Sequence, residues 1–142
     1  MKFEKARLSD VTAIIALYKS VFSWAWMKTG RKFDKKYVIT RLVAAIRNDI
    51  TLVSRDSNEI IAFGWARKNR DHFGNLFGEI VILIVAESQQ NHGVGKSLLA
   101  VLETKLPKDI RLSVLIGNER KQLYRKMGYS DFLKVLRKNR VL

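Results

Sequence analysis

The sequence predicts an α/β fold, a mixed central sheet with helices on both faces, in one domain over residues 1–142. Three observations predict it. Helix-spaced apolar patterns alternate with strand-like runs, no repeat or proline-rich linker divides the chain, and 142 residues with 47% apolar content suit a single core. Lys plus Arg total 27 and Asp plus Glu total 13, so the net charge of +14 is predicted to lie on the surface.

Caps and apolar spacing predict the N-terminal elements. A first strand is expected at 2–8, after which Ser9 and Asp10 offer helix caps before an amphipathic pattern. Asp34 stands in the same place before a second such pattern. The apolar positions are 11, 14, 15, 18 and 22 in the first helix and 38, 42, 43 and 46 in the second.

Polar turns separate the next three strands, which are predicted to form a meander. The turn at 56–58 joins the first two strands, and the turn at 69–75 leads into a longer strand that ends near Val85. The first two strands are at 50–54 and 60–67. The run at 80–86 is far shorter than the roughly 18 apolar residues of a membrane span, so a buried strand is predicted there.

Glycines and a proline bound the C-terminal elements. One helix enters at Gly93 and is stopped by Pro107, and a second helix ends at Gly128. A strand at 110–116 lies between them, and a last strand is predicted at 132–136. The predicted order is therefore β-α-α-β-β-β-α-β-α-β.

The composition excludes several kinds of chemistry. Without cysteine the chain has no disulfide, no thiolate zinc site and no thiol nucleophile. His72 and His92 have no partner at helical ligand spacing, so no metal centre is predicted. The N-terminus lacks the apolar stretch of a signal peptide, and we expect a cytoplasmic protein with no membrane partner.

The segment 80–99 joins a buried strand, a polar loop, two close glycines and an amphipathic helix. Amides at a helix start converge and the helix dipole adds about half a positive charge, so this arrangement favours anion binding. Gly93 and Gly95 let a phosphate approach the backbone, and Lys96 adds a cation. The segment ends like a P-loop, G-x-x-x-x-G-K-[ST], but Gln90 stands where the first glycine would be, which disfavours that interpretation.

Two motifs in order carry a resemblance to a known family. Gln90-Asn-His-Gly93-Val-Gly95 fits Q/R-x-x-G-x-G/A, and later Asn118 precedes a helix with Tyr124 and then a Gly-aromatic pair. With the opening at 6–10 as well, the sequence resembles the GNAT superfamily of N-acetyltransferases over essentially the whole chain. The resemblance implies a mostly antiparallel central sheet, acetyl-CoA as cosubstrate and no metal.

The resemblance also implies where the cofactor binds. The pantetheine arm pairs in this family with the last residues of the central strand, here Leu83 and Val85, and amides of the following loop take the pyrophosphate. Those loop residues are Gln90, Asn91, His92, Gly93, Val94, Gly95 and Lys96. Asn118 is implied to touch the cofactor as well as capping the last helix, although it precedes Tyr124 by six residues where the family often has seven. Tyr124 is implied to protonate the departing thiolate, the alternative being a tyrosine packed on the sheet.

A base would help the amine attack, because a lysine amine of pKa ~10.4 is only about one part in a thousand neutral near pH ~7.4. Glu79 lies six residues before Val85, and period-two alternation predicts that it shares a face with Val81, Leu83 and Val85. Some family members use a glutamate on this strand as base. The alternative is a strand-entry glutamate paired with a surface lysine or arginine.

The predicted function is acetyl-CoA-dependent N-acetylation of a small-molecule or peptide primary amine by direct attack. The amine would enter beside the first two helices, where Trp24, Trp26, Met27 and Trp65 either line a pocket or pack in the core. The positive charge gathers at 28–36, 67–70 and 134–140, which disfavours a polycationic acceptor and suits an acidic partner. Two alternatives stay open: a non-catalytic CoA-binding or sensor protein, and a basic module associated with nucleic acid. Either a monomer or a homodimer is compatible with the sequence.

Overall fold

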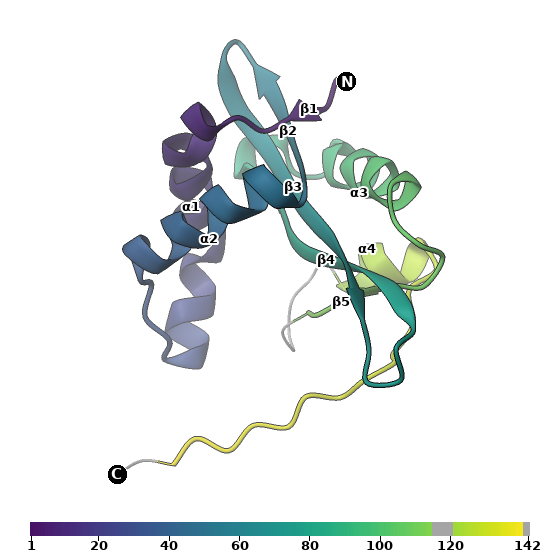
Figure 1. Ribbon diagram of the computed structural model, residues 1–142. Coiled ribbons are helices and arrows are strands. Elements are labelled where there is room, and N and C mark those ends of the chain that lie inside the picture. The colour runs from purple at the N-terminus through teal and green to yellow at the C-terminus, as the bar shows by residue number, and fades with distance from the viewer. Residues whose placement is uncertain (115–120, 141–142) are drawn as a thin grey trace.

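The fold is built on a five-stranded sheet in the order β1-β2-β3-β4-β5 (Figure 1). The computed structural model describes residues 1–114 and 121–140, without the side chains of residues 24–29. The strands are β1 (Glu4–Lys5), β2 (Ile50–Asp56), β3 (Glu59–Arg70), β4 (Leu76–Val85) and β5 (Ile110–Leu112). The helices are α1 (Val11–Thr29), α2 (Lys35–Asn48), α3 (Val94–Thr104) and α4 (Lys121–Lys126), with short 3₁₀ turns η1 (Leu8–Asp10) and η2 (Glu87–Gln89).

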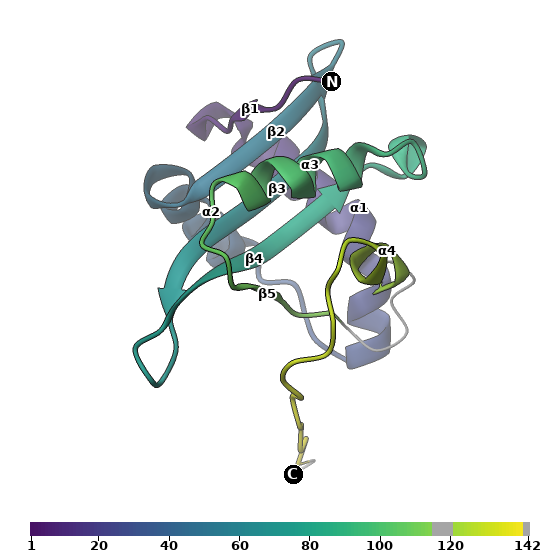
Figure 2. The same cartoon turned by 90° about the vertical axis from the view of Figure 1, so that its right-hand side faces the viewer.

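The sheet is mixed and mostly antiparallel, as predicted. Strands β1 to β4 pair antiparallel, whereas β5 pairs parallel to β4. Helices α1 and α2 cover one face and α3 covers the other, so the chain has helices on both faces (Figures 1 and 2). The predicted cap at Asp34 is confirmed, since its carboxylate accepts the backbone N–H of Tyr37 at 3.0 Å.

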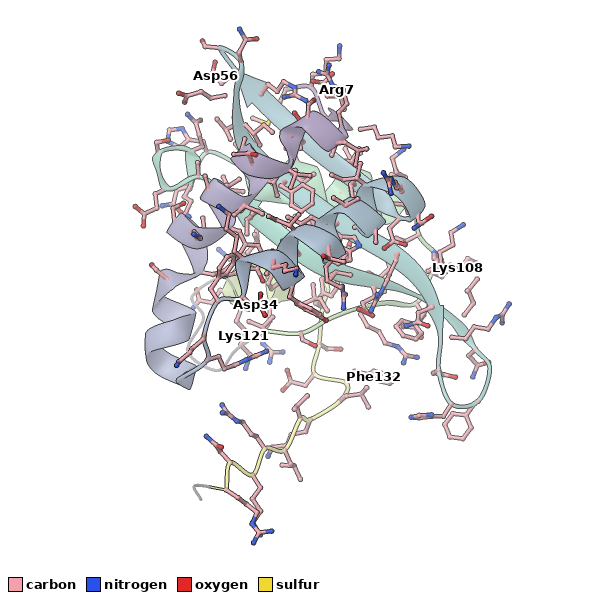
Figure 3. The ribbon with its side chains drawn as sticks, turned by 60° about the vertical axis from the view of Figure 1, so that its left-hand side comes forward. Arg7, Asp34, Asp56, Lys108, Lys121 and Phe132 are labelled. Atoms are coloured by element: carbon pink, nitrogen blue, oxygen red, sulfur yellow. The ribbon has the colours of Figure 1, made fainter. Side chains whose placement is uncertain are left out.

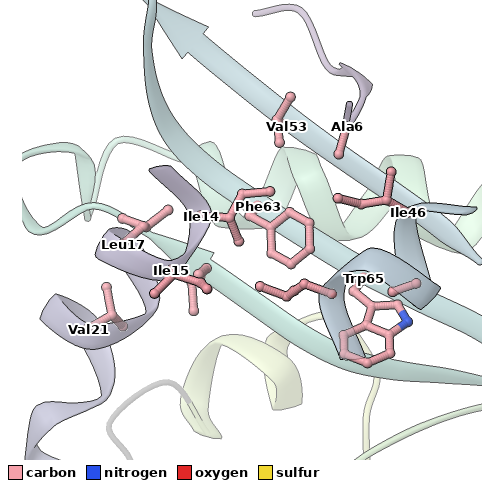
Figure 4. Packing of buried hydrophobic residues seen from close by; sticks show 12 residues of the cluster. Ala6, Ile14, Ile15, Leu17, Val21, Ile46, Val53, Phe63 and Trp65 are labelled. Carbon is pink, nitrogen blue, oxygen red and sulfur yellow. The ribbon is translucent and has the colours of Figure 1, made fainter. Parts of the chain in front are cut away.

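Each face of the sheet has its own apolar core. On the α1/α2 face, Phe63 and Trp65 of β3 pack with Ile14 of α1 (Figure 4). On the α3 face, leucines of α3 pack so closely on Gly64 that a Cβ there would lie 2.8 Å from Leu102 Cδ1. Glycine at this position therefore lets the helix approach the sheet.

A β-bulge in β4 changes which residues face each core. Trp65 pairs with Ile82 and the next β3 residue, Ala66, pairs with Ile80, which leaves Val81 as an extra residue. Below the bulge Ile80 faces the α3 core, and above it Leu83 faces the same core. Their separation of three residues shows that the period-two alternation is interrupted.

Ion pairs join the N-terminus to the α1/α2 face. The Arg55 guanidinium donates to both carboxylate oxygens of Asp10, at 2.9 and 2.7 Å, and its Nε donates to Glu4 at 2.7 Å. Hydrogen bonding from Arg55 holds the pKa of the Asp10 carboxyl below its usual value. The same carboxylate accepts the N–H of Arg7 at 2.8 Å, which fixes the chain just before α1.

The C-terminal segment after α4 differs from the prediction. No strand forms at 132–136 within the described residues; these residues are exposed, and the chain runs away from the sheet (Figure 1). The Phe132 ring (Figure 3) lies against the Arg111 guanidinium of β5, 4.7 Å from its carbon, before the chain departs. On one face of a strand at 132–136, Lys134 would stand between Phe132 and Leu136, and the other face would offer only Leu133 and Val135 for burial.

Other differences concern the bounds of elements. The first strand is shorter than predicted, and the strand expected at 110–116 and the helix expected at 119–127 are described only in part. Among the described helices, none has the length and apolarity needed to cross a bilayer.

Candidate functional site

A cavity of about 750 Å³ lies at the C-terminal end of β4. Residues from both faces of the sheet line it: α1 contributes Val21 and Phe22, α3 contributes its first turn, and α4 contributes Leu123, Tyr124 and Lys126. The remaining described lining comes from β4, the loop after it, and the end of β5 with the two residues that follow. Its members include Ile80, Val81, Ile82, Leu83, Val85, Glu87, Gln90, Leu112, Ser113 and Val114.

The cavity opens where β4 and β5 part. The described pairing joins Gly78 to Ile80 of β4 with Ile110 to Leu112 of β5, whereas β4 itself continues to Val85. Ser113 and Val114, just beyond β5, then form the opposite wall. A molecule in this opening can therefore reach the α3 side and the α1 side of the sheet at once.

The loop between β4 and α3 closes one end of the cavity. Asn91 and Gly93 both have positive φ, +66° and +79°, which is a conformation that glycine adopts without strain. Helix α3 then starts at Val94, and its first amides have no acceptor within the helix. The loop is tied to the strand because the Gln90 side-chain amide donates to the Val85 carbonyl at 3.1 Å.

The predicted loop residues are thus brought together, with one exception. Gln90, Asn91, Gly93, Val94, Gly95 and Lys96 line the cavity along with Leu83 and Val85. His92 is exposed and does not appear in the described lining. The described lining of the cavity contains two lysines, Lys96 and Lys126, and one carboxylate, Glu87. The excess of positive charge favours binding of an anion in the cavity.

Tyr124 comes to the cavity from α4. It is buried in the α3-side core and also lines the cavity. Asn118, predicted to reach the same site, lies outside the described residues.

Glu79 occupies a different place from the one predicted. It pairs across β3 with Arg67, whose Nη2 donates to the carboxylate at 3.0 Å. Because of the bulge, Glu79 faces the α1/α2 side while Leu83 and Val85 face the α3 side, so the prediction of one shared face is wrong. Glu79 is also absent from the described lining of the cavity.

The predicted aromatic pocket is only partly visible. Trp65 is buried in the α1/α2-side core, where its indole N–H donates to Asp49 at 2.9 Å. The side chains of Trp24, Trp26 and Met27 lie outside the described residues. For Trp65, the packing alternative is therefore the observed one.

Sequence reasoning missed several lining residues. Phe22 was recognised only as an apolar position of the first helix, Val21 was not singled out, and Glu87 was recognised only as part of a polar loop. Ser113 gave no signal, because its position follows from the divergence of β5 from β4. No group of three or more potential metal-ligating side chains occurs in the part of the chain that the structure describes.

A comparison with protein families decides the relationship. The model of the acetyltransferase (GNAT) domain matches residues 47–131, more than half of the chain. The chain belongs to the GNAT family. The matched region contains the bulged β4, the glycine loop, α3 and α4, so it includes most of the cavity lining described above.

Solved structures share this GNAT fold over nearly their whole length. A tetramutant of the BH1408 protein from Bacillus halodurans is 20% identical with a TM-score of 0.84, and the match covers 98% of this chain and 99% of that one. The aminoglycoside N-acetyltransferase AAC(6')-Iy, solved with CoA, is 12% identical with a TM-score of 0.78, covering 98% and 93%.

A third GNAT structure comes from a different kind of acetyltransferase. The ribosomal-protein-alanine N-acetyltransferase from Brucella melitensis biovar Abortus 2308 is 18% identical with a TM-score of 0.74, covering 98% of this chain and 100% of that one. A search of curated protein sequences gives no significant match. At these identities the likeness shows the fold, and the predicted GNAT resemblance and fold class are both confirmed.

Proposed function

We propose that this protein transfers an acetyl group from acetyl-CoA to a primary amine. The observation that carries the proposal is that the glycine loop and Tyr124 line one cavity, which reaches both faces of the sheet. The family match to an acetyltransferase domain supports the reaction type.

The loop would hold the pyrophosphate of acetyl-CoA. The first amides of α3 have no acceptor within the helix, and Lys96 and Lys126 line the same cavity. The pantetheine arm would then run beside Leu83 and Val85 toward the opening between β4 and β5. In this arrangement the thioester would lie in the part of the cavity that Tyr124 lines.

The reaction would proceed by direct attack. The amine nitrogen forms a bond to the acetyl carbonyl carbon while the carbon–sulfur bond breaks, and the Tyr124 hydroxyl gives its proton to the departing thiolate. The attacking nitrogen, which becomes cationic as the bond forms, loses a proton to a base, and Tyr124 regains its proton from solvent. Backbone donors near the end of β4 would stabilise the developing oxyanion.

Glu79 is our proposed base, acting through water. Because of the bulge, Glu79 lies on the α1/α2 side of the sheet. The cavity reaches this side, where Val21 and Phe22 of α1 line it. Its ion pair with Arg67 and its place outside the described lining require a bridging water for the proton to reach it. An acceptor with a less basic amine would depend on this base less.

The acceptor would be a small molecule or a peptide with acidic character. The α1–α2 connection contains Arg31 and Lys32 and leads to Lys35 and Lys36, close to the side where the amine would enter. These cations would repel a polycation such as an aminoglycoside and attract an acidic acceptor.

Calorimetry on matched glycine variants tests the cofactor site. Gly93 and Gly74 both have positive φ and open space around them, but Gly74 lies in the distant β3–β4 turn. We expect Gly93→Ala to weaken CoA binding by about tenfold and Gly74→Ala to leave it unchanged.

Two results would contradict the proposal. Absence of saturable CoA binding by the native protein would remove the cofactor site, and equal affinities of the two variants would remove the role of the loop. Saturable binding without turnover of any acidic, neutral or basic amine would favour the CoA-sensor alternative.

A further inference from the structure

The chain immediately after α4 folds back on Tyr124. The backbone N–H of Tyr129 donates to the Tyr124 carbonyl at 3.0 Å, and the N–H of Gly128 donates to the Arg125 carbonyl at 3.1 Å. Gly128 has φ of +95°. These bonds form a Schellman motif, in which a left-handed glycine lets two amides cap the end of a helix.

The two tyrosine side chains of this motif are in contact. Their ring centroids lie 6.0 Å apart at an interplanar angle of 68°, an edge-to-face arrangement. The Tyr129 ring therefore borders the side chain of Tyr124, which is itself buried beside the cavity.

A hydrogen bond to α3 holds the Tyr129 side chain. Its hydroxyl donates to Glu103 Oε2 at 2.7 Å. Burial and the neighbouring Glu103 carboxylate raise the pKa of Tyr129, so the hydroxyl keeps its proton and remains a donor at neutral pH. Donation to a carboxylate is stronger than a neutral hydrogen bond.

Helix α3 links this contact to the glycine loop. Glu103 stands in the last turn of α3 and Gly93 is the N-cap of the same helix. An eleven-residue helix is stiff along its length, so the Glu103 side chain has a defined position relative to the loop. The path from the loop to Tyr124 thus runs through α3, Glu103 and Tyr129.

We propose that Tyr129, anchored by Glu103, is a positioning residue that sets the orientation of the Tyr124 side chain relative to the glycine loop. The proposal rests on the proposed function, in which Tyr124 protonates the thiolate. The motif of the glycine loop and the presence of Tyr124 do not by themselves predict that a second tyrosine is hydrogen-bonded to Glu103. The bond joins α3 to the segment just after α4, and it is a half-buried polar contact at the edge of a mainly apolar core.

Fluorine NMR on protein containing 3-fluorotyrosine tests the proposal without an acceptor. The chain has four tyrosines, so four resonances are expected, and each is assigned by its Tyr→Phe variant. The informative comparison is Glu103→Ala against Glu103→Gln, because glutamine retains an oxygen that accepts from the Tyr129 hydroxyl. We expect the Tyr124 resonance to broaden or split in Glu103→Ala and to stay native-like in Glu103→Gln.

A matched control separates this effect from general loosening of α4. Asp131 forms an exposed ion pair with Arg125 of α4 at 2.5 Å, and we expect Asp131→Asn to leave the Tyr124 resonance unchanged. A native-like Tyr124 resonance in Glu103→Ala overturns the proposal. So does an equal change in Glu103→Ala and Asp131→Asn.

The same spectra show which hypothesis has failed. CoA added to the native protein is expected to shift the Tyr124 resonance, and no shift with saturating CoA counts against the proposed function alone. The ligand-free comparison of the two Glu103 variants still decides the positioning role.

Turnover gives a second readout where the amine panel identifies an acceptor. Tyr129→Phe should lower kcat by about fivefold and change KM for acetyl-CoA by less than about twofold, since misorientation affects the transition state more than binding. In a Tyr124→Phe background the Tyr129→Phe effect should disappear, because the two residues act as one unit. A full fivefold effect in that background would show that Tyr129 does not act through Tyr124.

Discussion

The two faces of the sheet are held together in different ways. The α3 face is packed by leucines against glycine, with Leu102 and Leu98 directly over Gly64 and Leu106 directly over Gly78. The α1/α2 face combines an apolar core with charged contacts, such as Arg55 on Asp10 and Arg67 on Glu79.

This difference matches the two halves of the proposed site. A cosubstrate that is the same molecule in every turnover is served by a tightly packed face and by backbone groups, whose positions depend little on side-chain identity. An acceptor amine is served by side chains on the other face, where charge can discriminate between substrates. We therefore expect substitutions on the α3 face to act through geometry and those on the α1/α2 face to act through charge.

Tyr124→Phe should have the largest effect, because it removes the proton donor on the cofactor side. We expect kcat to fall by about 100-fold with CoA affinity unchanged, in the range for loss of a general acid. Steady-state kinetics and calorimetry on the same preparation measure both quantities. Tyr37→Phe, on exposed α2 surface, is the control, and an unchanged kcat in Tyr124→Phe would refute the acid role.

Asp10→Asn tests the charged contacts of the α1/α2 face. The Asp10 side chain is 7% exposed and that of Arg55 is 21% exposed, so loss of the carboxylate leaves a half-buried cation without its bidentate partner. We expect unfolding free energy to fall by about 2–3 kcal/mol, somewhat less than for a fully buried pair. Urea denaturation measures it, and Asp56→Asn at the exposed β2–β3 turn is the control.

The same ion pair predicts how stability depends on pH. Arg55 lowers the pKa of Asp10 in the folded state, so the unfolded state binds the proton more tightly. The stabilisation is fully present above the ordinary carboxyl pKa of about 3.9 and is lost as pH falls through the lower folded-state pKa. The native protein should therefore lose more stability on acidification than Asp10→Asn, and parallel curves would contradict this.

Gly64→Ala tests the close packing of the α3 face. A Cβ at this position would lie 2.8 Å from Leu102 Cδ1 and 3.1 Å from Leu98 Cδ1, so α3 must shift or its leucines must change rotamer. We expect a loss of about 1–2 kcal/mol by urea denaturation, together with weaker CoA binding if the glycine loop shifts with α3. Ala66→Gly, on the same strand and face, gives a matched change without overpacking. Unchanged stability in Gly64→Ala would show that the face adapts.

Glu79→Gln should have the smallest effect on the reaction rate, and this effect distinguishes a base from a structural residue. If Glu79 accepts the amine proton through water, the rate should fall by about fivefold for a lysine-like amine and less for an α-amine of lower pKa. The ratio of the two rates is the measurement, with Glu59→Gln at the start of β3 as the control. An equal loss for both amines would assign Glu79 a structural role with Arg67.

Local sequence patterns predicted the parts of the site that consist of backbone. Gly93 and Gly95 mark the loop because few other residues allow a left-handed turn and a close approach there, and the helix after them follows from apolar spacing. Tyr124 was singled out by the resemblance to the family signature, in which an asparagine precedes a helix with a tyrosine and then a Gly-aromatic pair. These signals lie within a few residues of the feature they predict.

The features that failed depend on distant parts of the chain. Val81 has no local mark of a bulge, and only its pairing with β3 shows that Glu79 and Leu83 lie on opposite faces. Phe132 looks like part of a strand, yet its ring packs on Arg111 and the residues after it leave the sheet.

The amino-acid order by itself predicted the family and the glycine loop, because short-range backbone geometry and helix periodicity are encoded by neighbouring residues, and Tyr124 remains a prediction from the family resemblance. Tertiary structure alone decided that Glu79 pairs with Arg67, that Tyr129 reaches Glu103, and that Val21 and Ser113 share a cavity wall with the loop. These contacts require strands to register and helices to dock, and those events are set by the packing of the whole core.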